Sequence, residues 1–131
     1  VDFCIAGHDL PVSIRQQAGL AVRLGGEAGP PLCVRTNFAY RSHTHHMLPG
    51  EILCLFTDGV TEAMNNRGEL FGKHRLMAVL DTGAQPGSSP GILVSSIREA
   101  VREFVGSTER SDDLTILALR WNGPETPDSP A

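Results

Sequence analysis

Hydrophobic residues recur along the chain in short clusters, and two of these clusters have the spacing of an amphipathic helix. Residues 90–105 give the clearest pattern, with one apolar residue or pair in each turn. The residues of this stripe are Leu93, Ile97, Val101, Phe104 and Val105. Ser89 stands at the capping position and Pro90 in the first turn, as is typical of a helix start. A second helix is expected over residues 72–80.

Other apolar runs predict strands at residues 1–6, 12–15, 20–24, 52–57 and 114–121. The second and third of these are separated by a short turn and should form a hairpin. The last two are apolar at consecutive positions, so we expect both faces of each to be covered. Strands occur before, between and after the helices without regular alternation. This order favours a layered α+β fold over a doubly wound sheet.

The chain has 131 residues, which is the size of one domain. Residues 122–131 contain several prolines and no apolar pattern, so we expect a disordered tail there. The first residue, Val1, lies at the start of an expected strand and is not methionine. We therefore expect the sequence to be a fragment of a longer protein.

Charge and cysteine content exclude several classes of partner. The net charge is −4, and no cluster of Lys and Arg indicates binding to nucleic acid or to a membrane surface. No apolar run is long enough to span a bilayer. Three cysteines cannot all pair, and Cys4 and Cys54 lie in strand-like runs, so we expect free buried thiols in a reducing cytoplasm.

Two acidic sites stand at the ends of expected strands. Asp58 follows the apolar run 52–57, and Asp112 and Asp113 precede the run 114–121. An ionised carboxylate in apolar surroundings loses hydration unless a cation or hydrogen bonds compensate it. We expect the two strands to be antiparallel neighbours in one sheet. Asp58 would then lie beside one of the other two aspartates, and oxygen ligands of this kind suit Mg²⁺ or Mn²⁺. The alternative is ordinary turn chemistry at Asp58 and Gly59, with the second pair facing water.

Several histidines are weaker candidates for a site. His43, His45 and His46 could bind a transition metal, yet they lie in an irregular stretch without carboxylate partners. His8 follows the first expected strand, where we expect it to shape a turn; an indirect role beside a metal site is the alternative. Gly59 is likewise expected to shape the turn after Asp58.

Four motifs taken together resemble a known family. They are AGHDLP (6–11), GPPLCV (29–34), LPGEILCLFTDGVTEAMNNRGELFG (48–72) and SDDLTILALR (111–120). In this order and spacing they are similar to the C-terminal portion, here residues 1–121, of bacterial metal-dependent protein phosphatases. These belong to the PPM family of stage II sporulation protein E type, relatives of the type 2C serine/threonine phosphatases. Cys33 departs from the pattern, since related sequences carry glycine there.

The resemblance implies a four-layer α-β-β-α sandwich, here without its N-terminal strands and helices. It implies a site for two Mn²⁺ or Mg²⁺ ions at one edge of the sheets. Asp58 and Asp112 match the family's catalytic metal ligands, whereas Asp113 would hydrogen-bond around the site or coordinate more weakly. In the family, a hydroxide that bridges the two ions attacks phosphorus directly.

The implied function is hydrolysis of phosphoserine or phosphothreonine in a regulatory protein, with an anti-sigma-factor antagonist as the substrate suggested by the family. A further family aspartate that bridges both ions would lie upstream of residue 1. We therefore expect the 131 residues alone to be inactive as an enzyme. The alternative is a non-catalytic interaction module that keeps the fold and has lost the complete metal site.

Overall fold

The computed structural model describes residues 1–107 and 113–124. The strands are β1 (Asp2–Phe3), β2 (Ile5–Ala6), β3 (Val12–Arg15), β4 (Leu20–Arg23), β5 (Ala28–Gly29), β6 (His43–Thr44), β7 (Ile52–Phe56) and β8 (Ile116–Arg120). The helices are α1 (Asp58–Thr61), α2 (Gly72–Gly83) and α3 (Pro90–Val105). The expected disordered tail falls mainly on residues 125–131, which lie outside the described residues.

A four-stranded antiparallel sheet in the order β4-β3-β7-β8 forms the centre of the fold. The β3–β4 hairpin confirms the expectation from the sequence. The predicted pairing of β7 with β8 is also confirmed, from Ile52 opposite Arg120 to Phe56 opposite Ile116. This register places the end of β7 beside the start of β8.

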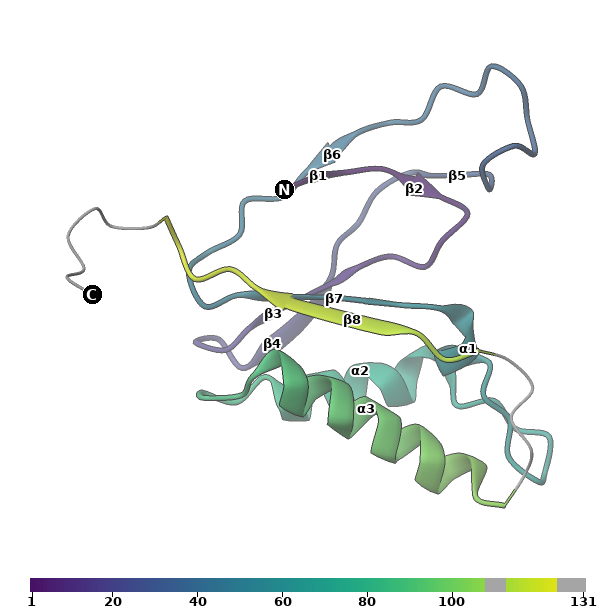
Figure 1. Ribbon diagram of the computed structural model, residues 1–131, viewed down its shortest axis with the longest axis vertical. Helices are drawn as coiled ribbons and strands as arrows, with labels where there is room; N and C mark the ends of the chain where they lie inside the picture. Colours follow the sequence, from purple (N-terminus) through teal and green to yellow (C-terminus); the bar gives the residue numbers. More distant parts are fainter. Residues whose placement is uncertain (108–112, 125–131) are drawn as a thin grey trace.

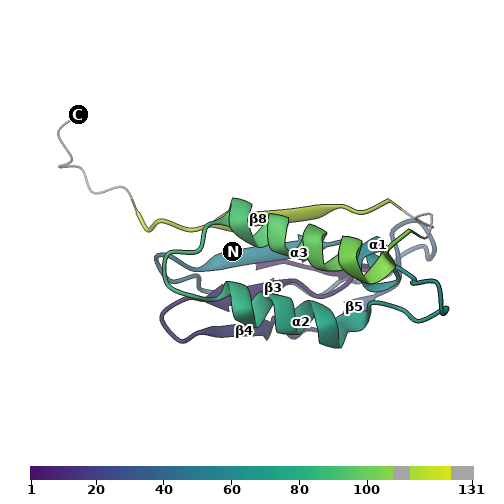
Figure 2. The ribbon, with the colours of Figure 1, turned by 90° about the horizontal axis from the view of Figure 1, so that it is seen from below.

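Helices α2 and α3 cover one face of this sheet (Figure 1), and Figure 2 shows them side by side across it. The apolar stripe of α3 is buried as predicted: Leu93, Ile97 and Val101 are at most 1% exposed. Ser89 caps the helix, because its Oγ accepts a hydrogen bond from the Ile92 N–H at 3.2 Å. Helix α2 runs to Gly83, one turn beyond its expected end.

Two small sheets lie on the opposite face of the central sheet (Figure 1). Strand β1 pairs with β6 in antiparallel orientation, and β2 pairs with β5 in parallel orientation. The single strand expected over residues 1–6 is therefore two short strands with different partners. Cys4 lies between them and is exposed, so the expectation that it is buried is wrong. The layered α+β arrangement itself is confirmed, as part of an α-β-β-α sandwich.

Strand β8 is covered on one face only, contrary to the expectation from its continuous apolar run. Ile116 and Ala118 pack against the core, whereas Leu117 and Leu119 are 55% and 41% exposed. Successive side chains of a strand point to opposite faces, and the short strands of the second layer cover little of this edge. In β7 the expectation holds better, because only Leu55 is partly exposed.

Cys54, in the middle of β7, is buried as expected. Burial raises the pKa of its thiol to about 11, because the thiolate would lose its hydration. This thiol therefore stays protonated and unreactive at neutral pH. None of the helices in the described ranges is long and apolar enough to cross a membrane.

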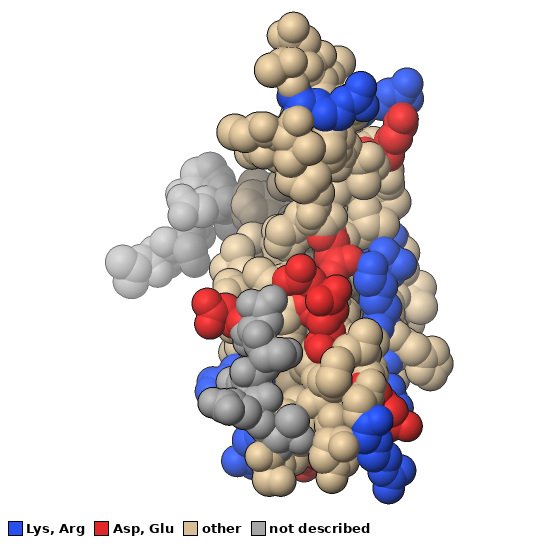
Figure 3. Space-filling view, turned by 90° about the vertical axis from the view of Figure 1, so that its right-hand side faces the viewer, with Lys and Arg blue, Asp and Glu red and all other residues tan. Residues whose placement is uncertain are grey.

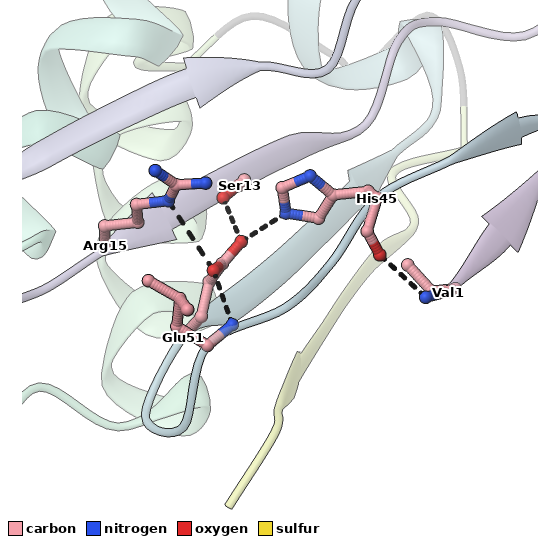
Figure 4. A network of polar contacts seen from close by, with 6 residues as sticks. Val1, Ser13, Arg15, His45 and Glu51 are labelled. Carbon is pink, nitrogen blue, oxygen red and sulfur yellow. Dashed lines mark hydrogen bonds and ion pairs between the residues drawn. The ribbon is translucent and has the colours of Figure 1, made fainter. Parts of the chain in front are cut away.

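A buried carboxylate, Glu51, ties the start of β7 to its surroundings (Figure 4). Its side chain is 1% exposed. One oxygen accepts hydrogen bonds from Ser13 Oγ and His45 Nε2, both at 2.5 Å, and the other accepts the Leu48 N–H at 2.9 Å. Arg15 Nε lies 3.6 Å away. Burial by itself would raise the pKa of Glu51, but these hydrogen bonds and the charge of His45 hold the pKa below 4.5.

Replacing Glu51 with glutamine should lower the free energy of unfolding by roughly 2–4 kcal/mol near neutral pH. The glutamine side chain would place its two N–H donors among groups that themselves donate hydrogen bonds, namely Ser13, His45 and the Leu48 N–H. Because folding lowers the pKa of Glu51, its stabilisation is complete above the unfolded-state pKa and is lost as the pH falls through the folded-state pKa. Urea unfolding as a function of pH should therefore show the two proteins converging at acidic pH. Glu103→Gln, an exposed change on α3, is the control. Equal stabilities at neutral pH would contradict this account.

Candidate functional site

Three strand ends meet at one edge of the central sheet. Strand β3 begins at Val12, which lies opposite Cys54 in the middle of β7, so the loop before β3 runs beside the end of β7. Strand β8 begins at Ile116, opposite Phe56. The loop before β3, the residues after β7 and the residues before β8 are therefore neighbours. From the sequence, the residues after β7 and those before β8 were expected to lie at the site, but the loop before β3 was not.

Hydrogen bonds of Thr57 join the end of β7 to the chain before β8. Its N–H donates to the Thr115 carbonyl at 3.1 Å, which continues the β7–β8 ladder by one residue. Its hydroxyl donates to the Asp113 carbonyl at 3.2 Å and accepts the Thr115 N–H at 3.1 Å. These bonds hold the start of α1 against the chain that leads into β8. The backbones that carry Asp58 and Asp113 are thus fixed close together.

Gly59 allows this close approach. It is buried and lies within helix α1, not in the turn that the sequence suggested. A Cβ atom at this position would overlap the carbonyl oxygen of Asp113 and lie 3.0 Å from its carbonyl carbon. Both are backbone atoms, which cannot rotate away. The requirement for glycine is therefore steric, and it comes from the contact between α1 and the chain before β8.

A cavity of about 260 Å³ opens at this edge, lined by Gly7, His8, Asp9, Thr57 and Asp58. Figure 3 shows the face that carries α1, where Asp and Glu side chains gather near the middle beside a column of Lys and Arg side chains. Asp9 was not anticipated as a site residue. The available signal was its position in the turn that follows the first expected strand, within the motif AGHDLP. His8 is exposed, and its Nδ1 lies 3.1 Å from the Asp9 carbonyl oxygen.

Asp58 reaches this cavity as the first residue of α1. It is exposed, and its carboxylate makes no hydrogen bond or ion pair with another residue in the ranges 1–107 and 113–124. The expectation of a charge in an apolar setting is wrong, because strand β7 ends two residues earlier and water reaches the side chain. A carboxylate that is exposed to solvent and has no positively charged partner can bind a cation.

The other predicted site residues are placed in part. Asp113 is exposed at the same edge, with its carbonyl bound to Thr57. Asp112 lies outside the described residues, and so does its predicted approach to Asp58. Within those residues, no group of three or more His, Cys, Asp or Glu side chains is arranged to hold a metal ion. Asp9 and Asp58 supply oxygen ligands only, the type that Mg²⁺ and Mn²⁺ prefer.

The histidines around residue 45 have structural contacts. His45 bonds Glu51, and the His43 ring packs on Phe3 with 5.6 Å between ring centroids. His45 thus has a carboxylate partner, contrary to the expectation, and this bond joins the chain after β6 to the start of β7. His43 and Phe3 are cross-strand partners within the β1–β6 pair. The two histidines do not lie with the carboxylates of the cavity.

Comparison with known proteins identifies the family. Residues 1–122 match the family described as stage II sporulation protein E. Protein IcfG of Synechocystis sp. is 31% identical over 122 residues, which are 93% of this chain and 18% of that relative. The chain thus spans less than a fifth of the curated relative it matches.

Two solved structures show the same fold. The PP2C domain of SiaA from Pseudomonas aeruginosa superposes with a TM-score of 0.67 at 23% identity, over 86% of this chain and 44% of that one. A structure containing the PP2C phosphatase domain of SpoIIE from Bacillus subtilis has a TM-score of 0.67 at 18% identity, over 91% of this chain and 33% of that one. These structures share the fold of this chain, and by its sequence match over residues 1–122 the chain belongs to the stage II sporulation protein E family.

Proposed function

We propose that this chain is part of a protein phosphatase that hydrolyses phosphoserine or phosphothreonine in a regulatory protein. The observation that carries the proposal is the cavity at the edge of the sheet, where Asp58 and Asp9 lie at the meeting point of three strand ends. The family membership supplies the reaction class. Asp58 has no positively charged partner among the described residues, whereas Asp9 is paired with Lys73.

The residues present fit a divalent metal ion. Asp58 lines the cavity without a positively charged partner among the described residues, so its carboxylate would attract a divalent cation. Asp58 and Asp112 are the proposed ligands, and Mn²⁺ or Mg²⁺ is the proposed ion. Such an ion, when bound, lowers the pKa of a coordinated water and offsets the negative charge of the phosphoryl group. The protein's own contribution is to hold the carboxylates in place, through the Thr57 hydrogen bonds and the close contact at Gly59.

The proposed setting is bacterial signalling in the cytoplasm. A phosphorylated anti-sigma-factor antagonist, or a similar small regulator, is the proposed substrate. The three cysteines are free, as they would stay in a reducing compartment. The proposed substrate rests on the family. The proposed compartment rests on the family and on the free cysteines.

The test is hydrolysis of a phosphoserine peptide by the full-length protein in Mn²⁺ and, as the matched control, in excess EDTA. We expect release of phosphate in Mn²⁺ only. Hydrolysis that persists in EDTA would contradict the metal-dependent mechanism. No hydrolysis under any metal would favour the alternative, a non-catalytic interaction module.

The two neighbouring aspartates should differ in importance. Consecutive side chains of an extended chain point to opposite sides, so both cannot face one ion equally. Asp112→Asn should largely abolish activity, whereas Asp113→Asn should lower activity or metal affinity by only about 10–100-fold. Titration of activity with Mn²⁺ for both variants of the full-length protein measures this. If Asp113→Asn is the more damaging change, the assignment of the ligand is reversed.

A further inference from the structure

A lysine from helix α2 reaches the rim of the carboxylate cavity. Lys73, the second residue of α2, places its Nζ 2.6 Å from Asp9 Oδ1. The Asp9 side chain is 16% exposed and lines the cavity together with Asp58. The Lys73 side chain is 52% exposed. A half-exposed positive charge is thus held next to an acidic cavity by one of that cavity's own carboxylates.

The nearby cation Arg75 has fixed contacts of a different kind. Its Nη1 donates to the carbonyls of Leu70 and Phe71, both at 3.1 Å, and its guanidinium lies 4.6 Å from the centre of the Phe104 ring. In the described ranges, Lys73 has Asp9 as its ion-pair partner. Unlike Arg75, it makes no hydrogen bond to a backbone carbonyl and no contact with an aromatic ring there. Lys73 is therefore the cation at this rim that can change partners.

We propose that Lys73 binds the phosphoryl group of the substrate next to Asp58, and that Asp9 holds the ammonium in position until the phosphate arrives. This inference rests on the proposed phosphatase function. A phosphoserine carries a charge between about −1.5 and −2 and three acceptor oxygens, whereas a cavity lined by carboxylates repels it. Lysine binds phosphate as a point charge on a flexible stem.

Breaking the ion pair between Lys73 and Asp9 should cost little free energy. Ion pairs with one half-exposed member contribute little to stability, because solvent screens them. A hydrogen bond from an ammonium to a phosphate dianion is charge-assisted and stronger than a neutral one. Phosphate should therefore displace Asp9 as the partner of Lys73. Asp9 competes with the phosphate, so the two residues should have opposite effects on phosphate binding.

The experiment uses the full-length protein in Mn²⁺ and two probes, a phosphoserine peptide and inorganic phosphate. The variants are Lys73→Gln, Lys73→Arg, Asp9→Asn and the double variant. Arg98→Gln removes the same charge from an exposed position on α3 and is the control. Lys73→Gln should raise the KM for the peptide and the inhibition constant of phosphate about tenfold, the loss of one charge-assisted hydrogen bond, with kcat much less affected. Lys73→Arg should recover part of this loss.

Asp9→Asn should tighten phosphate binding several-fold, and most of that gain should disappear when Lys73 is also replaced. An unchanged phosphate inhibition constant in Lys73→Gln would overturn the inference. Weaker phosphate binding in both single variants would also overturn it, since that result describes a purely structural ion pair.

Calorimetric titration of phosphate into the Mn²⁺-loaded protein tests the inference without turnover. If wild type binds phosphate and Lys73→Gln binds it about tenfold less tightly, the inference holds even where no hydrolysis is found. If wild type hydrolyses the peptide and Lys73→Gln binds phosphate equally well, the proposed function stands and the role of Lys73 is wrong. If wild type neither hydrolyses the peptide nor binds phosphate, both are wrong.

Discussion

Asp58→Asn is expected to reduce metal-dependent phosphatase activity of the full-length protein by roughly 10³-fold or more. The change replaces an anionic ligand with a neutral amide of the same shape, so the attraction for a divalent cation falls sharply. Asp58 is exposed, and its side chain makes no hydrogen bond or ion pair with the other described residues, so folding should be unaffected. The measurement is kcat/KM for a phosphoserine peptide at increasing Mn²⁺, together with the melting temperature.

Glu103→Gln supplies the control, because it removes one negative charge from an exposed site on α3. It should leave both activity and stability unchanged. An Asp58→Asn variant that retains wild-type activity would remove Asp58 from the site. A variant that loses activity only because it unfolds would point to a structural role instead.

The second large effect is expected at Gly59. In Gly59→Ala, the new methyl group overlaps the Asp113 carbonyl, so α1 must move away from the chain before β8. Overpacking of this kind costs about 3 kcal/mol at the upper end of its usual range. The movement should also break the hydrogen bonds of Thr57 and shift Asp58 away from the chain before β8, so that activity falls together with stability.

Chemical unfolding and phosphate release measure the two consequences for Gly59→Ala. Gly25→Ala is the control, because a Cβ atom at Gly25 meets nothing within 4 Å. It should be as stable as wild type. If Gly59→Ala is also as stable as wild type, the close contact between α1 and the chain before β8 does not constrain the site.

Local patterns in the sequence were sufficient to predict helices α2 and α3, the hairpin and the pairing of β7 with β8, but not the short helix α1. In α3, the apolar period, the Ser89 cap and Pro90 all indicate the same element, so the prediction was accurate at both ends. The β7–β8 pairing followed from two apolar runs that had to share one core. In these segments, local preference and burial agree.

The failures come from contacts that are distant in sequence. The coverage of Leu117 and Leu119 depends on what lies on the far side of β8, which hydrophobicity does not specify. Cys4 is exposed because the first strand divides between two partners. Asp9 joins Asp58 only because β3 lies antiparallel to β7, and its partner Lys73 comes from α2. The sequence was sufficient to place β7 beside β8, but it did not place the loop before β3 or helix α2 at the same site.

The central claim is that Asp58 binds a divalent metal ion at the edge of the central sheet. Crystals of the full-length protein soaked in Mn²⁺ test this directly, through the anomalous signal of manganese. We predict a peak within direct coordination distance of an Asp58 carboxylate oxygen, and no such peak in Asp58→Asn. A manganese ion bound elsewhere, with Asp58 paired to a protein cation or facing only water, would contradict the account.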